Sequence, residues 1–202
     1  MSKLRILTAT ALVMACAVSA VHAQQQAQRL AGTIERVEGS TVFAKGRDGG
    51  AVTLKLPDNV VVTAVFKATV ADIKPGAYIG SGATPQADGS QKAVEVHIFA
   101  ESMRGQGDGH RPGWYGATNG TMTNGAVGQT VSSVDGPVLT VKYRDGEKKI
   151  IVGPSVPVTR LEVANKSELK SGVAVAAAAA TKKPDGTFTA ARIDFGRGDV
   201  LP

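Results

Sequence analysis

The sequence predicts an all-β protein made of two small closed antiparallel β-barrels in tandem, joined by a Gly-rich linker. The first observation is a duplication: residues 32–39 (GTIERVEG) open a stretch that residues 128–136 (GQTVSSVDG) open again. Later matches stay in step at an offset of roughly 96 to 97 residues, which indicates a duplicated domain rather than a short-period repeat. The second observation is that short β-prone runs alternate with turn dipeptides, as in small all-β domains.

The first copy is divided by residues that favour turns. Asp48-Gly49 supplies the positive φ that a tight hairpin turn requires, and Pro57, Pro75 and Asp88-Gly89 interrupt the later runs. Residues 68–74 are expected to form one helical turn, which Pro75 ends. The strands expected in this copy are 32–38, 41–46, 51–56, 60–66, 77–83 and 91–99.

The second copy repeats this order and resolves one ambiguity. Residues 176–180 are five alanines, which helix propensity alone would assign to a helix. Their counterpart in the first copy contains Gly80 and Gly82, which disfavour a helix, so we expect a strand of small residues at a close backbone approach. The strands expected here are 128–134, 137–143, 147–152, 156–163, 173–181 and 187–195.

The patterns within the strands favour closed barrels. Val94, Val96 and Ile98 alternate with polar residues, so one face of this strand is expected to point inward. The first strand of each copy spaces its apolar residues by three, at Ile34–Val37 and at Val131–Val134, which predicts a bulge that bends the strand. Short, bent antiparallel strands in about 70 residues resemble an oligonucleotide-binding (OB) barrel.

The N-terminal residues predict export. Lys3 and Arg5 precede an apolar run, and Val21-His22-Ala23 suits signal-peptide cleavage before Gln24, which would leave a periplasmic or secreted protein. The alternative is a lipid anchor on Cys16, which the apolar residues beyond it disfavour. The expected division is a signal peptide 1–23, a polar segment 24–29, repeat 1 at 30–100, the linker 101–126, repeat 2 at 127–196 and a tail 197–202.

Charge and cysteine usage exclude several functions. Cys16 is the only cysteine and lies in the expected signal, so the mature chain has no disulfide or thiol chemistry. Loss of Lys3 and Arg5 lowers the formal charge from +6 to about +4, without a long basic run, and no nucleic-acid partner is expected. No second apolar segment has the length needed to span a bilayer.

Several of these motifs together resemble a known kind of protein. The GTIERVEG opening, the turn at 47–49 and the segment 72–76 (DIKPG) are similar to an uncharacterised family of exported bacterial β-barrel repeat domains. The segment 103–112 (MRGQGDGHRP) resembles a linker in two-copy members. The resemblance implies the fold and the compartment, and it implies no activity, because the family is one of unknown function.

The linker has no counterpart in the duplication and carries the first candidate site. Arg104, His110, Arg111 and Trp114 stand among glycines, and guanidinium groups and aromatic faces can bind a carboxylate, a phosphate or a ring. The alternative interpretation is a flexible connector, since linkers are commonly Gly-rich for that reason alone.

A second set of residues suggests a weaker alternative. Glu95, His97 and His110 are candidate metal ligands, although no His pair stands at ligand spacing. No nucleophile motif or acid–base constellation is evident, so an enzyme is not expected. The sequence therefore predicts a non-enzymatic, exported binding or scaffolding protein of the cell envelope that needs no cofactor. Its expected partner is an envelope protein, an anionic glycan or a small anion, and the alternative function is metal handling or transport assistance.

Overall fold

A computed structural model describes residues 28–114, 117–198 and 200–202. The expected signal peptide, its cleavage position near Ala23 and the alternative anchor Cys16 lie outside these residues. The described residues form β-strands and three short 3-10 turns and contain no α-helix, which confirms the all-β prediction. Within them, no helix has the length and apolar character that crossing a membrane requires.

The strands follow the predicted order with three differences: β7 was not predicted, β8 begins seven residues before the expected 128–134, and the expected strand 187–195 is divided into β13 and β14. Those of the first half are β1 (Gln28–Glu38), β2 (Thr41–Gly46), β3 (Ala51–Lys55), β4 (Val61–Ala68), β5 (Tyr78–Pro85) and β6 (Gln91–Phe99). The region that follows contains β7 (Gly109–Pro112) and the first part of β8 (Thr121–Val131). The remaining strands are β9 (Val138–Tyr143), β10 (Gly146–Ile151), β11 (Val158–Ala164), β12 (Ala174–Lys182), β13 (Phe188–Ala190) and β14 (Arg192–Gly196).

Two details of local structure were predictable from the residues. The alanine run lies inside β12, where the duplication predicted a strand against helix propensity. Single 3-10 turns at Val70–Asp72 and Lys166–Glu168 occupy equivalent places in the two halves. In each turn, a residue at the start and an acidic residue three positions later cap one another, Thr69 with Asp72 and Asn165 with Glu168.

A closed five-stranded β-barrel forms one lobe of the molecule, and its strands come from both copies of the duplication. The pairings run β8–β9, β9–β10, β10–β6, β6–β5 and β5–β8, which closes the ring. β5 and β6 belong to the first copy, whereas β8, β9 and β10 belong to the second. The barrel is therefore completed by strands exchanged between the copies.

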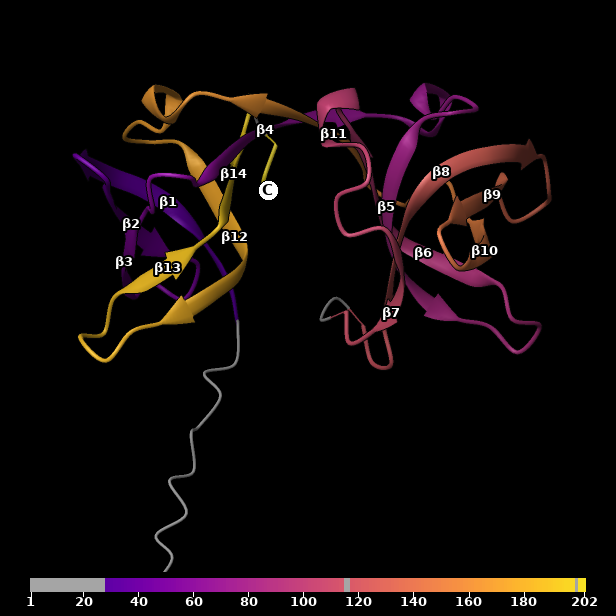
Figure 1. Cartoon of the computed structure of the whole chain (residues 1–202), viewed down its shortest axis with the longest axis horizontal. Helices are drawn as coiled ribbons and strands as arrows, with labels where there is room; N and C mark the ends of the chain where they lie inside the picture. Colours follow the sequence, from indigo (N-terminus) through magenta and orange to yellow (C-terminus); the bar gives the residue numbers. More distant parts are fainter. Residues whose placement is uncertain (1–27, 115–116, 199) are drawn as a thin grey trace, which may run out of the picture.

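The other lobe has the equivalent pairings with the two copies interchanged. They run β1–β2, β2–β3, β3–β13, β13–β12 and β12–β1, and so return to the first strand. Here β1, β2 and β3 come from the first copy, and β12 and β13 come from the second. Figure 1 shows the consequence as mixed colours in the left-hand lobe, where indigo strands lie beside orange and yellow ones.

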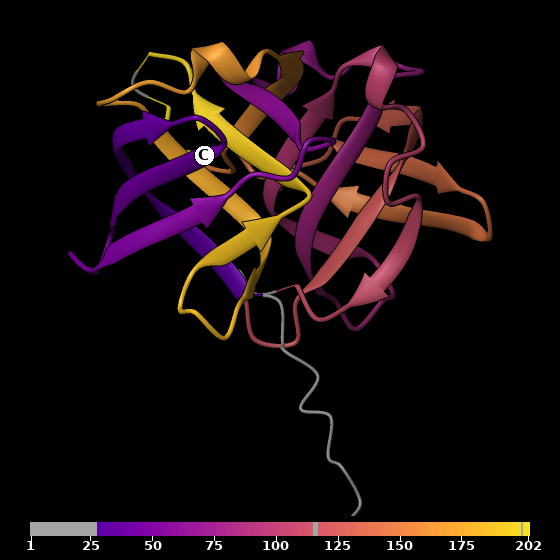
Figure 2. The ribbon, with the colours of Figure 1, turned by 60° about the vertical axis from the view of Figure 1, so that its left-hand side comes forward.

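β4 and β11 connect the lobes at one end of the molecule. They pair with one another antiparallel from Val158 opposite Ala68 to Ala164 opposite Val62. β4 also pairs with β14, and β11 also pairs with β6, both in parallel. β4 therefore lies between β14 and β11, and β11 lies between β4 and β6. As a result, the sheet is continuous from one lobe to the other (Figures 1 and 2).

Each lobe has its own hydrophobic core, built from both copies. In the lobe of β8, β9 and β10, the fully buried Leu139, Val141 and Ile150 pack with Ile79 and Val96 of the first copy. In the other lobe, residues of β1, β2 and β3 pack with Val175, Ile193 and Phe195 of the second copy. Neither copy encloses a core alone, so burial of apolar surface depends on the exchange.

The exchange changes the domain organisation expected from the duplication. The ranges 30–100 and 127–196 were predicted to be two barrels, but neither range contains a ring of strands. The covalent repeat and the packed lobe are therefore different units. The similarity between the two halves of the sequence shows which segment was duplicated. A lobe, in contrast, is formed by strands that pair although they are distant in the sequence.

The structure also corrects the alignment of the first strands. The bulge in β1 lies between Ile34 and Arg36, as predicted, but the bulge in β8 lies between Val127 and Gln129 rather than at Val131–Val134. Gly125 consequently matches Gly32: a Cβ on either would lie 2.3 Å from a carbonyl oxygen of the neighbouring strand, at Lys142 and Lys45 respectively. Val134 is fully exposed and takes no part in the core.

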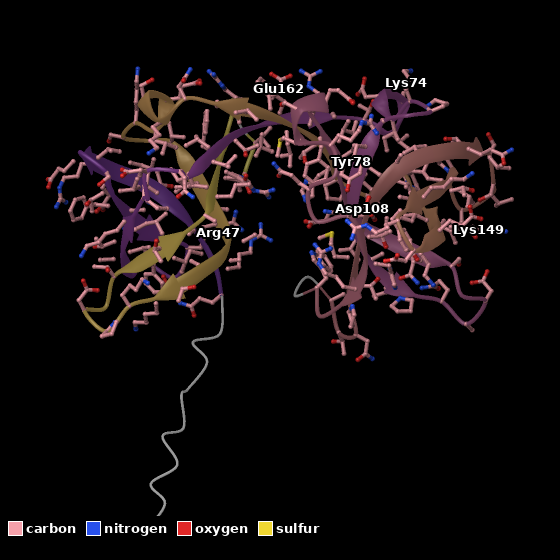
Figure 3. The ribbon with its side chains drawn as sticks, in the orientation of Figure 1. Arg47, Lys74, Tyr78, Asp108, Lys149 and Glu162 are labelled. Atoms are coloured by element: carbon pink, nitrogen blue, oxygen red, sulfur yellow. The ribbon has the colours of Figure 1, made fainter. Side chains whose placement is uncertain are left out.

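The segment 101–126 is more than a connector. It contains a 3-10 turn at Glu101–Met103, the short strand β7 and the first six residues of β8. Met103, Trp114 and Thr123 are buried within it. The Tyr78 hydroxyl lies 3.3 Å from Asp108 Oδ2 of this segment, and both side chains are labelled in Figure 3. These contacts hold the segment against the barrel.

Candidate functional site

A cleft lies between the two lobes, beneath the paired strands β4 and β11. Its larger part has a volume of about 550 Å³ and a smaller adjoining part has about 150 Å³. The two parts share Glu95, His97, Ala178 and Arg192, so they form one continuous feature. Because β6 contributes the first two residues and β12 and β14 the others, both lobes line the cleft.

One wall contains a hydrogen-bonded chain of three side chains. Glu95 and His97 are two residues apart on β6 and therefore lie on the same face of the strand. His97 Nε2 lies 3.1 Å from Glu95 Oε1, and His97 Nδ1 lies 2.7 Å from Thr159 Oγ1. Thr159 is opposite His97 in the pairing of β11 with β6. Both ring nitrogens are thus engaged, which fixes the orientation of the imidazole.

The other lobe presents the equivalent positions with different side chains. The duplication matches Glu95 with Arg192 and His97 with Asp194, and Asp194 is opposite Thr63 in the pairing of β14 with β4. Arg192 Nε lies 3.0 Å from Asp194 Oδ1, and Arg192 Nη2 lies 3.0 Å from Oδ2. Arg192 therefore contacts both carboxylate oxygens, but only the contact with Oδ2 is a hydrogen bond, since Oδ1 accepts none from the described residues.

The Glu95 carboxyl is ionised because the neighbours that lower its pKa outweigh the burial that raises it. Burial raises the pKa of the Glu95 carboxyl, whereas the hydrogen bond and charge of His97, the charge of Arg29 and a hydrogen bond from the Trp114 side chain lower it. The net result is a pKa below the ordinary value of 4.5. Its side chain is only 21% exposed, so these interactions are weakly screened by solvent.

Trp114 forms part of the wall opposite the alanines of β12. Its side chain is buried against Gly82 of β5, where a Cβ would lie 2.3 Å from the indole ring. The backbone N–H of Trp114 donates to the Gly120 carbonyl, which holds the segment after β7 close to the start of β8. Glycine at position 82 is therefore what allows the tryptophan to reach the cleft and Glu95.

Asn124 contributes a polar group to the same wall. Its Nδ2 donates to the Gln106 carbonyl at 2.9 Å, which fixes the orientation of the amide. Its Oδ1 is buried beside Gly80 and accepts no hydrogen bond from the described residues. A buried acceptor without a donor costs free energy on the order of 1–3 kcal/mol. Gly80, Gln106 and Asn124 all line the cleft.

The structure separates the four residues predicted to bind a ligand. Arg111 and Trp114 line the cleft. Arg104 does not, because it pairs with Glu101 at 2.5 Å and donates to the Gly76 carbonyl. His110 lies in a different surface depression, where its Nδ1 is 2.8 Å from Thr123 Oγ1 and its ring stacks on Tyr143.

The predicted metal ligands are likewise divided. Glu95 and His97 are in contact, but His110 has the separate surroundings just described. Among the residues that the structure describes, no three His, Cys, Asp or Glu side chains are grouped closely enough to hold a metal ion. Burial and the positive charge of Lys148 lower the pKa of His110, in that order, which favours its neutral form.

Several cleft residues were missed by sequence reasoning. Arg192 and Asp194 were placed only within the expected strand 187–195, and Arg29 was placed in a polar N-terminal segment. Their role follows from strand exchange, which brings β14 and β1 opposite β6. One signal was available: the duplication matches Glu95 and His97 with Arg192 and Asp194, and charged groups at both equivalent positions indicate a shared polar surface.

Comparison with known proteins adds no relative. Searches with models of protein families, against curated proteins and against solved structures return no match for this chain.

Proposed function

We propose that the chain is a non-enzymatic binding or scaffolding protein, exported to the cell envelope, and that the cleft between its lobes is the ligand site. The observation that carries the proposal is the convergence of charged side chains from both copies on one cleft. Glu95 and Arg192 line its larger part of about 550 Å³, and Asp194 lines the adjoining part of about 150 Å³. Sites for small molecules commonly have a volume of 300–1,000 Å³ and a few convergent polar groups.

The fold supports a binding role at this place. We infer that both lobes are closed barrels of the OB kind, a fold that binds ligands on its strands and loops. A cleft lined by two covalently linked lobes can hold a ligand in contact with both. The partners that fit this proposal are an envelope protein segment, an anionic glycan or a small anion.

Hydrolysis is a second candidate, favoured by one observation. Thr159, His97 and Glu95 are connected in the order hydroxyl, imidazole, carboxylate, which is the connectivity of a nucleophile–base–acid triad. However, Thr63 occupies the position equivalent to Thr159 and is opposite Asp194, without a histidine. A threonine thus stands at this position in both copies although only one has a histidine opposite it, and Thr63 Oγ1 is buried without a hydrogen bond to the described residues. A threonine here does not by itself indicate a nucleophile. Binding is the better supported function.

A variant that fills the cleft tests the proposal. Ala179 is exposed on β12, lines the cleft and lies at a bulge in the pairing with β1. Ala179→Phe is expected to place a ring in the cavity and to abolish ligand retention. The measurement is affinity capture from an envelope extract on the immobilised full chain, followed by mass spectrometry of bound proteins, glycans and small molecules.

The matched control is Ala51→Phe, an exposed alanine at the start of β3 outside the cleft lining. Both variants should unfold at the temperature of the unmodified chain. The proposal fails if Ala179→Phe retains the same molecules as Ala51→Phe, or if the unmodified chain retains nothing above an empty resin.

A further inference from the structure

The hydrogen-bonding capacity left over in the cleft is mostly that of donors. Arg192 donates one N–H to Asp194 Oδ2, its Nε makes an ion-pair contact with Oδ1, and its other N–H groups have no hydrogen-bond partner among the described residues. Arg111 uses one on the Gly107 carbonyl, at 2.8 Å, and its other four are likewise without a partner there. Arg111 and Arg192 both line the larger part of the cleft, from opposite lobes.

The carboxylates of the cleft are already engaged. Asp194 Oδ2 accepts a hydrogen bond from Arg192, and Oδ1 lies 3.0 Å from Arg192 Nε as an ion pair, although it accepts no hydrogen bond from the described residues. Glu95 interacts with His97 and with the Trp114 side chain. A cationic ligand would therefore have to displace contacts that exist, whereas an anionic ligand could accept from N–H groups that are available. Among the described charged side chains of the lining, three are arginines, Arg29 included, and two are carboxylates.

The volume of the cleft and its remaining polar and apolar groups indicate a ligand larger than a simple ion. A volume of about 550 Å³ is far larger than an inorganic anion requires. Asn124 is buried, and its Oδ1 has no donor among the described residues, so a ligand hydroxyl could satisfy it. Phe99, Met122 and the exposed Ala178 add apolar surface to the walls. The complementary ligand has an oxyanion, hydroxyl groups and an apolar face.

We propose that the cleft binds an acidic sugar unit, whose carboxylate or phosphate contacts Arg111 and Arg192 and whose hydroxyl groups face the Asn124 wall. The assignment rests on the proposed function and specifies its ligand class. A uronate and a phosphorylated sugar present the same chemistry to the two arginines, so both are tested separately.

The only tryptophan of the chain reports binding directly, because Trp114 lines the cleft. Its fluorescence is followed while the full chain is titrated with D-glucuronate, glucose 6-phosphate, D-glucose, cyclohexanecarboxylate and inorganic phosphate. At least one of the first two should bind about tenfold or more tightly than the last three, because only they combine an oxyanion with ring hydroxyls. Isothermal titration calorimetry measures the same affinities without the fluorophore.

Two variants locate the oxyanion. Arg111→Gln removes one set of donors, and Arg192→Lys keeps a positive charge beside Asp194 but lacks the planar fork. Each variant should bind the acidic sugar with an affinity about tenfold or more lower than that of the unmodified chain. The controls are Arg104→Gln, in the same segment but outside the cleft, and Arg160→Lys, which pairs with Glu162 two residues away as Arg192 pairs with Asp194. Both controls should bind as the unmodified chain does.

The outcomes separate this proposal from the broader one. Equal affinity for D-glucose and the acidic sugars, unchanged affinity in both cleft variants, or no binding of any probe overturns the acidic-sugar assignment. The broader binding role stands in each case if the unmodified chain, but not Ala179→Phe, still captures envelope molecules. If the unmodified chain and Ala179→Phe capture the same molecules, the binding role of the cleft is itself overturned.

Discussion

At the scale of single residues, Glu95 is the most constrained charge of the cleft. Its carboxylate interacts with His97 and Trp114 while only 21% of its side chain is exposed. A buried group with several partners leaves those partners unsatisfied when it is removed. The sequence identified Glu95 and His97 as neighbours on one strand face, but it could not reveal Arg29 and Trp114 beside them, because these contacts join segments distant in the chain.

We expect Glu95→Gln to lower the free energy of unfolding by about 1–3 kcal/mol near pH 7. Because the folded pKa of Glu95 lies below 4.5, its ionised form stabilises the fold above that pH, and this stabilisation is lost as the pH falls through the folded pKa. The difference between the two proteins should therefore shrink below about pH 4.5. Urea denaturation at a series of pH values measures it.

The control for this prediction is Glu162→Gln, which removes an exposed partner of Arg160. Exposed pairs contribute about 0–1 kcal/mol, so this variant should change stability little at any pH. A Glu95→Gln protein as stable as the Glu162→Gln protein at pH 7 would contradict the assigned role of Glu95.

At the scale of elements, most strand boundaries were predictable, but the early start of β8, the break between β13 and β14 and the structure of the segment 101–126 were not. Turn residues such as Asp48-Gly49 and Pro75 act locally, so they mark where strands end whatever the strands pair with. The glycines at 105, 107 and 109 suggested a flexible connector, yet all three have positive φ and form part of a defined path to β7. Composition does not distinguish glycine used for flexibility from glycine used for a specific backbone shape.

The contact of Trp114 with β5 provides a test of this element. Gly82→Ala is expected to destabilise the protein by about 1–3 kcal/mol, because the added Cβ would lie 2.3 Å from the indole ring. It should also shift the emission maximum of Trp114 by moving the ring toward solvent. Thermal unfolding followed by fluorescence measures both effects.

Gly153→Ala is the matched control, since the heavy atoms nearest to its Cβ would be 3.8 Å away. It should leave the emission maximum unchanged. An unaltered emission spectrum in Gly82→Ala would show that the position of the Trp114 ring does not depend on the absence of a side chain at residue 82.

At the scale of the whole molecule, the two copies are held together by strand pairing as well as by the chain. β12 pairs with β1, β13 with β3, β5 with β8, and β4 with β11. Two independent tandem barrels would have none of these pairings. The central pair β4–β11 therefore determines both the separation of the lobes and the position of the cleft beneath it.

A cut between the copies distinguishes the two architectures. Thr118 and Asn119 are exposed in the turn before β8, so a protease site inserted between them should be cleaved without unfolding. The cleaved fragments are expected to elute together in size-exclusion chromatography and to separate only in denaturant, because the hydrogen bonds between copies remain. The inserted but uncleaved chain is the control, and fragments that separate under native conditions would contradict the exchange.

The sequence by itself determined the all-β class, the order of the strands, the turns between them and the strand conformation of the alanine run. These follow from local preferences and from comparison of the two copies. Only the tertiary structure decided which strands are neighbours. The equivalent strands of the two copies carry similar patterns and offer the same backbone donors and acceptors, so pairing within a copy and pairing between copies satisfy the same local rules. β4 carries the first copy from one lobe to the other and β11 carries the second copy back, so each lobe contains strands of both copies, and the cleft between them brings Glu95 and His97 together with Arg192 and Asp194.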